Sequence, residues 1–307
     1  METRRIGSLE VSVVGLGTNN FGRSMTADQV PPVVDVALES GITFFDTADT
    51  YGDSEERLGQ ALGHRRDRVV LATKFGNSIG GAPAGASPDY VRTAVERSLR
   101  RLGTDHIDLY QLHTPDPSTP IAETLGALDE LITAGKVGEI GCSNFNAAQL
   151  REAAAAADQS GGHRFVSVQN HYNLLHRSDE EEVLPECRRE GLAYLPYFPL
   201  ASGLLSGKYA AGQAPPAGTR LERWGDRAKG VMTESNFAVI DALEGWASDH
   251  EHSVLDLAVA WLLADPVIPS VIAGATSAAQ VGANAAAGSW RLSAAQRSEI
   301  DRLAPAA

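Results

Sequence analysis

Four ionisable side chains stand at or near the ends of short apolar segments. Asp46 and Tyr51 belong to TFFDTADTYG, Lys74 lies in VVLATKF, and His113 ends LYQLH. A tyrosine with a pKa of about 10 is too weak an acid at neutral pH unless a nearby cation stabilises its phenolate. Lys74 would supply that cation, Asp46 would hold the lysine, and His113 would donate to a substrate oxygen or relay its proton. The set predicts a proton-transfer site.

Each of these residues also has a structural interpretation when it is taken alone. Asp46 could cap the next segment, Lys74 could extend its amine along apolar surface to solvent, and His113 could be a core histidine. A catalytic role is favoured because a lysine buried in a strand needs a partner, and Asp46 is the natural one. The same carboxylate argues against a Schiff-base role for Lys74, since it would raise the lysine pKa.

Eight short apolar segments are predicted to be the strands that position these residues. They span residues 11–17, 42–46, 68–75, 107–113, 138–144, 165–173, 192–200 and 270–276. Helical patterns lie between them, for example from Tyr90 to Leu102 after Ser87 and from Ile121 to Ile132 after Thr119. Eight strand–helix repeats predict one α/β domain over residues 1–307, a closed parallel (β/α)8 barrel of the TIM type.

Two details refine this expected architecture. The segment GLGTNNFG lacks the glycine spacing of a dinucleotide-binding turn, which argues against an open doubly wound sheet. Residues 206–233 predict a long, functional or mobile loop after the seventh strand, and extra helices are expected at the C-terminus. Because barrel chemistry collects at the C-terminal strand ends, Ser143, Asn144, Gln169 and Asn170 join the four ionisable residues as candidates.

Composition limits the classes of partner. The 307 residues include 39 acidic and 26 basic ones, and the net charge of −13 disfavours nucleic acid and anionic membranes. Two cysteines are too few for a disulfide framework and have no metal-site spacing, so no metal centre is predicted. Without a signal-like segment or a long apolar run, the sequence predicts a soluble, cytoplasmic protein.

The chain resembles the aldo-keto reductases over residues 4–304, in particular the bacterial long-chain members related to potassium-channel β-subunits. The motifs FFDTADTYG, ATKFG, DLYQLH, GCSN, LPYFPLASGLLSGKY and IAGATSAAQVGAN follow in the family's order. The resemblance implies an oxidoreductase that reduces an aldehyde or ketone to an alcohol, and the reverse, with Tyr51 as general acid. Asp46, Lys74 and His113 complete the implied catalytic set.

The implied cofactor is NADPH (NADP+), with NADH as an alternative. The residues that match the family's cofactor contacts are Gly17, Thr18, Asp46, Ser143, Asn144, Gln169, Tyr197, Leu200, Ser202, Leu205, Lys208, Gly274, Ala275, Thr276, Gln280 and Asn284. Phe198 replaces a frequent Ser, Ala283 replaces a frequent Glu, and GATS has no cation for a 2′-phosphate. Lys208 or Arg220 could supply the missing charge, so the expected NADPH preference is modest.

The expected substrate is a small-molecule carbonyl or alcohol. Its contacts are predicted to come from Asn19, Phe21, Tyr51, His113, Thr114, Asn170 and Trp224, and the two large aromatics Phe21 and Trp224 predict an apolar or aromatic face. The expected oligomeric state is a monomer or weak homo-oligomer. One alternative is a cofactor-holding redox sensor or regulatory subunit with slow turnover, but channel β-subunits carry Asn where this chain has His113.

Overall fold

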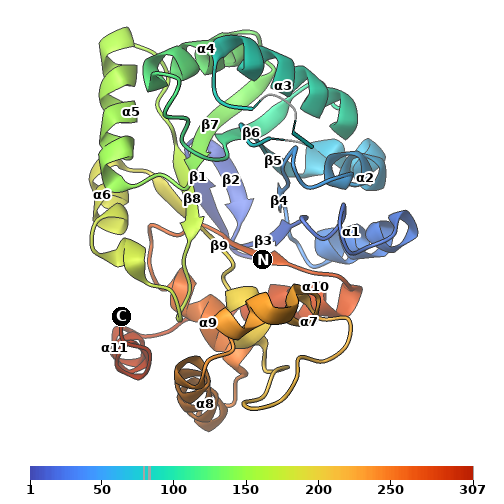
Figure 1. The fold of residues 1–307 in the computed structure, drawn as a ribbon, viewed down its shortest axis with the longest axis vertical. Coiled ribbons are helices and arrows are strands. Elements are labelled where there is room, and N and C mark those ends of the chain that lie inside the picture. The colour runs from blue at the N-terminus through green and yellow to red at the C-terminus, as the bar shows by residue number, and fades with distance from the viewer. Residues whose placement is uncertain (79, 82–83, 307) are drawn as a thin grey trace.

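A computed structural model describes residues 1–78, 80–81 and 84–306 of the chain. Eight parallel strands form one sheet in the order β10-β3-β4-β5-β6-β7-β8-β9. Because β9 and β10 also lie next to each other, the sheet nearly closes on itself (Figure 1), and the predicted barrel is confirmed. The strands are β3 (Val14–Gly17), β4 (Phe44–Asp46), β5 (Val70–Phe75), β6 (Ile107–Leu112), β7 (Val137–Ser143), β8 (Ser167–His171), β9 (Ala193–Tyr197) and β10 (Val271–Gly274).

Helices cover the outside of the barrel (Figure 1). The helix after Ser87 spans Pro88–Leu102, buries the predicted apolar stripe, and ends at Gly103, whose φ of 64° a glycine adopts without strain. The helices are α1 (Val30–Glu39), α2 (Ser54–Leu62), α3 (Pro88–Leu102), α4 (Ile121–Thr133), α5 (Ala147–Ser160), α6 (Val183–Glu190), α7 (Arg220–Trp224), α8 (Glu234–Asp249), α9 (Val254–Leu263), α10 (Ala278–Ala287) and α11 (Ala294–Leu303).

The chain begins with an antiparallel hairpin that the sequence did not predict. Strands β1 (Thr3–Ile6) and β2 (Leu9–Ser12) pair with each other, so the expected strand 11–17 is divided between the hairpin and β3. The division falls at Ser12, whose hydroxyl donates to Val14 O (2.6 Å) and accepts from Thr43 N (2.9 Å). The continuous apolar run VSVV hides this break.

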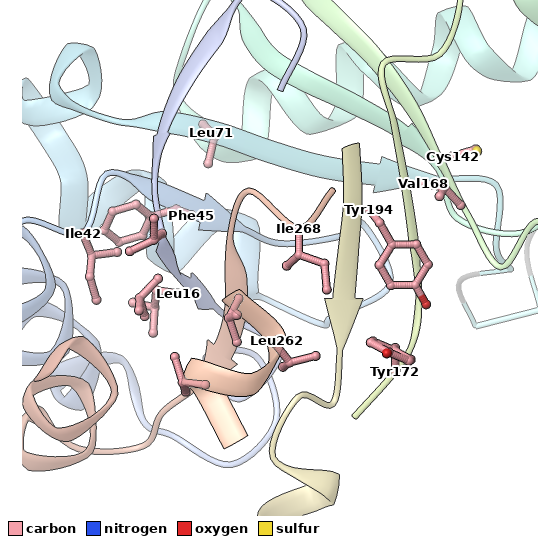
Figure 2. Close-up of a cluster of buried hydrophobic side chains, with 14 of the residues drawn as sticks. Leu16, Ile42, Phe45, Leu71, Cys142, Val168, Tyr172, Tyr194, Leu262 and Ile268 are labelled. Atoms are coloured by element: carbon pink, nitrogen blue, oxygen red, sulfur yellow. The ribbon is translucent and has the colours of Figure 1, made fainter. Parts of the chain in front are cut away.

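Side chains alternate between two apolar cores. Phe44, Ala72 and Leu109 face the barrel interior, where they pack with Ile6 and Val11 of the hairpin. Their neighbours in sequence face the helices, and Figure 2 shows part of that outer layer, including Phe45, Leu71, Tyr194 and Ile268. The hairpin therefore fills the N-terminal end of the barrel, while the C-terminal end is left for polar side chains.

The segment after β9 is more ordered than the sequence suggested. Residues 206–233 were expected to be one long loop, but they contain α7 and a 3₁₀ helix, Gly225–Gly230. Leu221 and Ala228 are buried in the outer core, which explains why the segment folds back on the barrel. The two cysteines, Cys142 and Cys187, are both free and fully buried.

Candidate active site

Alternation along the strands brings a lysine and an aspartate together inside the barrel. Asp46 lies two residues after Phe44, and Lys74 two residues after Ala72, so both face the interior. Lys74 Nζ is 2.5 Å from Asp46 Oδ2 and 3.0 Å from Thr47 O. Both side chains are buried, at 1% and 4% exposure. Burial opposes the lysine charge, but Asp46 and Tyr51 together hold the Lys74 pKa above its ordinary value.

The second carboxylate oxygen of Asp46 is held by two amides. Gln111 Nε2 donates to Asp46 Oδ1 at 3.2 Å, and Gln169 Nε2 donates to the same oxygen at 3.0 Å. Gln111 was not among the predicted site residues, although its position two residues before His113 on β6 is a signal for it. With its oxygens accepting from Lys74 and from two amides, Asp46 is suited to orient the lysine rather than to transfer protons.

Tyr51 lies between the lysine and the histidine. Lys74 Nζ is 5.3 Å from the centroid of the Tyr51 ring, and the Tyr51 and His113 rings meet edge to face with centroids 5.9 Å apart. Tyr51 is on the turn between β4 and α2 and lines a cavity at the C-terminal end of the barrel. The turn thus carries a phenol from the strand end to a position beside a buried ammonium.

His113 is held in its uncharged form. Burial, and then the charges of Lys74 and Arg23, lower its pKa to about 3. Its backbone N donates to Phe75 O at 2.8 Å, and Asn144 Nδ2 donates to its carbonyl at 2.9 Å. Its Nδ1 is buried without a hydrogen-bond partner among the described residues. A neutral imidazole placed in this way can donate one hydrogen bond from the nitrogen that faces the cavity.

The cavity encloses about 860 Å³. It is large enough for a dinucleotide fragment together with a small substrate. Most of the residues that were predicted for the catalytic, cofactor and substrate contacts line it, namely Gly17, Thr18, Asn19, Asp46, Tyr51, His113, Ser143, Asn144, Gln169, Tyr197, Leu200, Ser202, Lys208, Arg220, Gly274, Thr276, Gln280 and Asn284. Lys74 lies directly beneath, where it contacts Asp46.

Four residues expected at the substrate lie outside the lining of this cavity. Phe21 is fully buried in the outer core, because the turn that carries it points its ring inward. Asn170 donates to Phe145 O and to Asp179, and Thr114 donates to Asn77. Trp224 packs against the outer core beside Arg227. Trp224 also meets edge to face the ring of Phe198, which does line the cavity.

Two residues expected at the cofactor are also outside the lining. Leu205 and Ala275 are buried in the outer core, at 0% and 1% exposure. Each is an apolar residue within a segment whose polar neighbours do line the cavity, while its own side chain turns inward. The sequence could not distinguish the two orientations, because the φ angles of 60° at Ser202 and 100° at Gly203 interrupt a regular helix.

Several lining residues were not predicted. Asn20 and Arg23 follow Asn19 in the segment TNNFGR, and Asn77 follows the predicted strand KFG. Arg223 lies one helical turn after Arg220 on α7 and also lines the cavity. These polar residues could have been predicted from their positions next to predicted site residues. The sequence analysis instead favoured the large aromatics Phe21 and Trp224 as substrate contacts.

The cavity carries an excess of positive charge. Lys208, Arg220 and Arg223 line it, and within the described part of the chain none of the three forms an ion pair with a carboxylate. Burial and then mutual repulsion lower the pKa of Lys208 and of Arg220. Cations without counter-ions in a partly buried cavity suit an anionic ligand such as a phosphate group.

Tyr197 lies across the cavity on a stacked column of side chains. Its ring is parallel to that of His171, with centroids 5.4 Å apart, and His171 stacks in turn on His176 at 3.9 Å. The Tyr197 hydroxyl donates to Asn144 Oδ1 at 3.0 Å. The ring is thus fixed from behind and at its edge, with a surface available to a flat ligand.

The chain is similar to known proteins over most of its length. A sequence model of the aldo/keto reductase family matches residues 13–305. The aldo-keto reductase YhdN of Bacillus subtilis is 34% identical, over 96% of this chain and 90% of its own length. The NADH-specific methylglyoxal reductase of Escherichia coli is 35% identical over 89% and 87%.

A further relative, from Oryza sativa subsp. japonica, is named "Probable voltage-gated potassium channel subunit beta". It is 34% identical over 92% of this chain and 90% of its own. Among the described residues, no helix is both long enough and apolar enough to cross a membrane.

Proposed function

The chain belongs to the aldo/keto reductase family, and we propose that it reduces an aldehyde or ketone to an alcohol with NADPH, and catalyses the reverse oxidation. The observation that carries this proposal is the contact of Tyr51 with the buried Lys74–Asp46 pair and with neutral His113 in one cavity. Such a set places a proton donor next to a cation that can stabilise its conjugate base. The substrate is a small-molecule carbonyl or alcohol.

Each residue of the set has a distinct role in carbonyl reduction. A bound nicotinamide cofactor would supply the hydride for the carbonyl carbon. Tyr51 gives its hydroxyl proton to the carbonyl oxygen, and the Lys74 ammonium stabilises the phenolate that is left. His113, uncharged at neutral pH, donates a hydrogen bond to the same oxygen and orients it. Asp46 keeps Lys74 in place through its short ion pair.

The cavity lining supports binding of the cofactor along one side. Ser143, Asn144 and Gln169 offer polar groups for a carboxamide, next to the fixed ring of Tyr197. The cations of the 206–233 segment offer charge for phosphates, and Gly274, Thr276, Gln280 and Asn284 line the end that we assign to adenosine. Because these cations line the cavity, we propose NADPH as the preferred cofactor. We propose that NADH is also accepted, since one relative is named as NADH-specific.

Substitution of Tyr51 by Phe tests the assignment. Tyr51→Phe removes the proposed proton donor and keeps the ring, so we expect kcat for aldehyde reduction to fall roughly 10²–10⁴-fold. The dissociation constant of NADPH, from quenching of protein fluorescence, should change little because the ring remains. A variant that keeps most of its turnover would contradict the role of Tyr51.

The same assay separates catalysis from a regulatory role. The wild-type protein should oxidise NADPH continuously when an aldehyde is added, over many turnovers per protein molecule. A chain that binds the cofactor tightly but shows only a single slow turnover would favour a redox-sensing or regulatory subunit. The neutral His113 beside Tyr51 supports continuous turnover. It completes a set of proton-transfer groups that a site which only binds the cofactor does not need.

A further inference from the structure

Arg23 is held beside Tyr51 by a tight turn. A Cβ on Gly22 would lie 1.7 Å from Tyr51 O and 2.7 Å from Asp53 N, so only glycine allows the two segments to approach this closely. Arg57 Nη1 donates to Phe21 O and to Met25 O, at 2.6 Å each, which fixes the turn from the other side. The position of Arg23 relative to the proposed proton donor is therefore built into the backbone.

The guanidinium of Arg23 has no acidic partner. Its Cζ is 5.7 Å from the centroid of the Tyr51 ring, and it lines the cavity with its side chain exposed. The guanidinium donates one long hydrogen bond, from Nη2 to Thr50 O, at 3.4 Å. No carboxylate of the described residues lies within ion-pair distance of it. A full positive charge thus faces the reacting end of the cavity without compensation.

Asn77 adds a polar side chain to the cavity lining near His113. It accepts a hydrogen bond from Thr114, the residue after His113. Asp46 is the one acidic residue in the described lining, and its charge is already paired with Lys74. An anion that enters beside Tyr51 would meet a guanidinium and an amide, and it would meet no unpaired carboxylate.

We propose that the substrates of the reductase are oxo acids, in which a carboxylate lies a few bonds from the carbonyl group, and that Arg23 binds this carboxylate. The proposal rests on the proposed carbonyl reduction and names its substrate class. A guanidinium binds a carboxylate through two parallel hydrogen bonds, which also sets the orientation of the ligand. With the carboxylate at Arg23, the carbonyl oxygen lies within reach of Tyr51 and His113.

The test compares substrates that differ only in charge. Wild-type protein is assayed with 4-oxobutanoate and 5-oxopentanoate, each against its methyl ester, and kcat/KM is measured at saturating NADPH. We expect the carboxylates to be preferred, and Arg23→Met to reduce the carboxylate-to-ester ratio about 10- to 100-fold, mainly through KM. Arg23→Lys should restore part of the ratio, because lysine keeps the positive charge but cannot form the two parallel hydrogen bonds of a guanidinium.

A matched variant separates substrate binding from cofactor binding. Arg223→Met removes another cavity cation, on α7, and should raise the NADPH dissociation constant while the carboxylate-to-ester ratio stays the same. Wild-type turnover of the esters without any preference for the carboxylates would overturn the inference and leave the proposed function standing. A ratio unchanged in Arg23→Met, with weaker NADPH binding, would also overturn it and assign Arg23 to the cofactor. Absence of turnover with every carbonyl would overturn both proposals.

Discussion

Asp49 is a buried carboxyl group that the proposed mechanism does not use. It lies in the TADT turn, 5% exposed, and its Oδ1 has no hydrogen-bond partner among the described residues. Burial, and then the negative charge of Glu55, raise its pKa to about 7, although Arg101 acts in the opposite direction. The folded protein therefore retains a proton on Asp49 at pH values where the unfolded chain has lost it.

Stability should fall with rising pH because of this residue. Between pH 3.8 and about 7 the unfolded chain releases the Asp49 proton while the folded protein keeps it, so unfolding becomes easier as pH rises through that window. Asp49→Asn removes the titration. We expect the variant to gain about 4 kcal/mol of unfolding free energy relative to wild type between pH 4 and pH 8.

Urea titrations at pH 4, 5, 6, 7 and 8 measure this difference. Asp67→Asn, at an exposed position, is the control for removal of a surface charge. A difference between Asp49→Asn and wild type that is the same at every pH would show that Asp49 does not keep its proton in the folded state. The rate of aldehyde reduction by Asp49→Asn should also be measured, because the turn that holds Asp49 carries Tyr51 and a displaced turn would lower this rate.

At the scale of elements, two helix glycines that look alike in the sequence have opposite environments. A Cβ on Gly59 of α2 would lie 2.2 Å from Leu102 O at the end of α3, whereas one on Gly126 of α4 meets nothing within 4 Å. Gly59→Ala should destabilise the protein by about 1–3 kcal/mol through overpacking. Gly126→Ala should stabilise it by up to about 1 kcal/mol, since alanine favours the helix.

The two alanine variants also test how α2 positions the site. Tyr51 lies three residues before α2 begins at Ser54, so a displacement of the helix by Gly59→Ala should lower kcat as well. Gly126→Ala should leave kcat unchanged. Thermal unfolding and steady-state rates of both variants provide the comparison. Equal stabilities would mean that α2 and α3 can separate at no cost.

The elements also show what the sequence could predict. Asp46, Lys74 and His113 were expected together because the strands of a parallel barrel end at one rim, and the structure brings them together there. Phe21 was misplaced because the direction of a side chain in a tight turn depends on Gly22, whose close approach to Tyr51 O involves residues far along the chain. The hairpin was not predicted because the apolar run VSVV contains no glycine or proline to mark the break at Ser12.

At the scale of the whole molecule, the charge is distributed unevenly. The chain carries a net charge of −13, yet Arg23, Lys208, Arg220 and Arg223 all line the cavity, where Asp46 is the one acidic residue of the described lining. A phosphate approaching from solvent is repelled by the general surface and attracted by the cavity. Because these effects act over different distances, salt should change them to different extents.

Salt should therefore reduce the preference for NADPH over NADH. The turn at Gly274–Ser277 has hydroxyls and amides but no cation of its own. A nearby cation is Arg220, whose Nη2 atom lies 3.8 Å from the position that a Cβ on Gly274 would occupy. A 2′-phosphate held by such partly solvated charge gains a modest advantage, which screening weakens because the Debye length falls from about 10 Å at 0.1 M to about 3 Å at 1 M.

Dissociation constants of both cofactors from fluorescence quenching, at 0.05 M and 0.5 M salt, measure the effect. We expect a modest preference for NADPH at low salt and a smaller one at high salt, with NADH affected less because it lacks the additional phosphate charge. Arg220→Met should reduce the low-salt preference if that guanidinium supplies the attraction. A preference of several hundredfold that persists at high salt would require a close, desolvated cation at the 2′-phosphate. The GATS segment does not provide one.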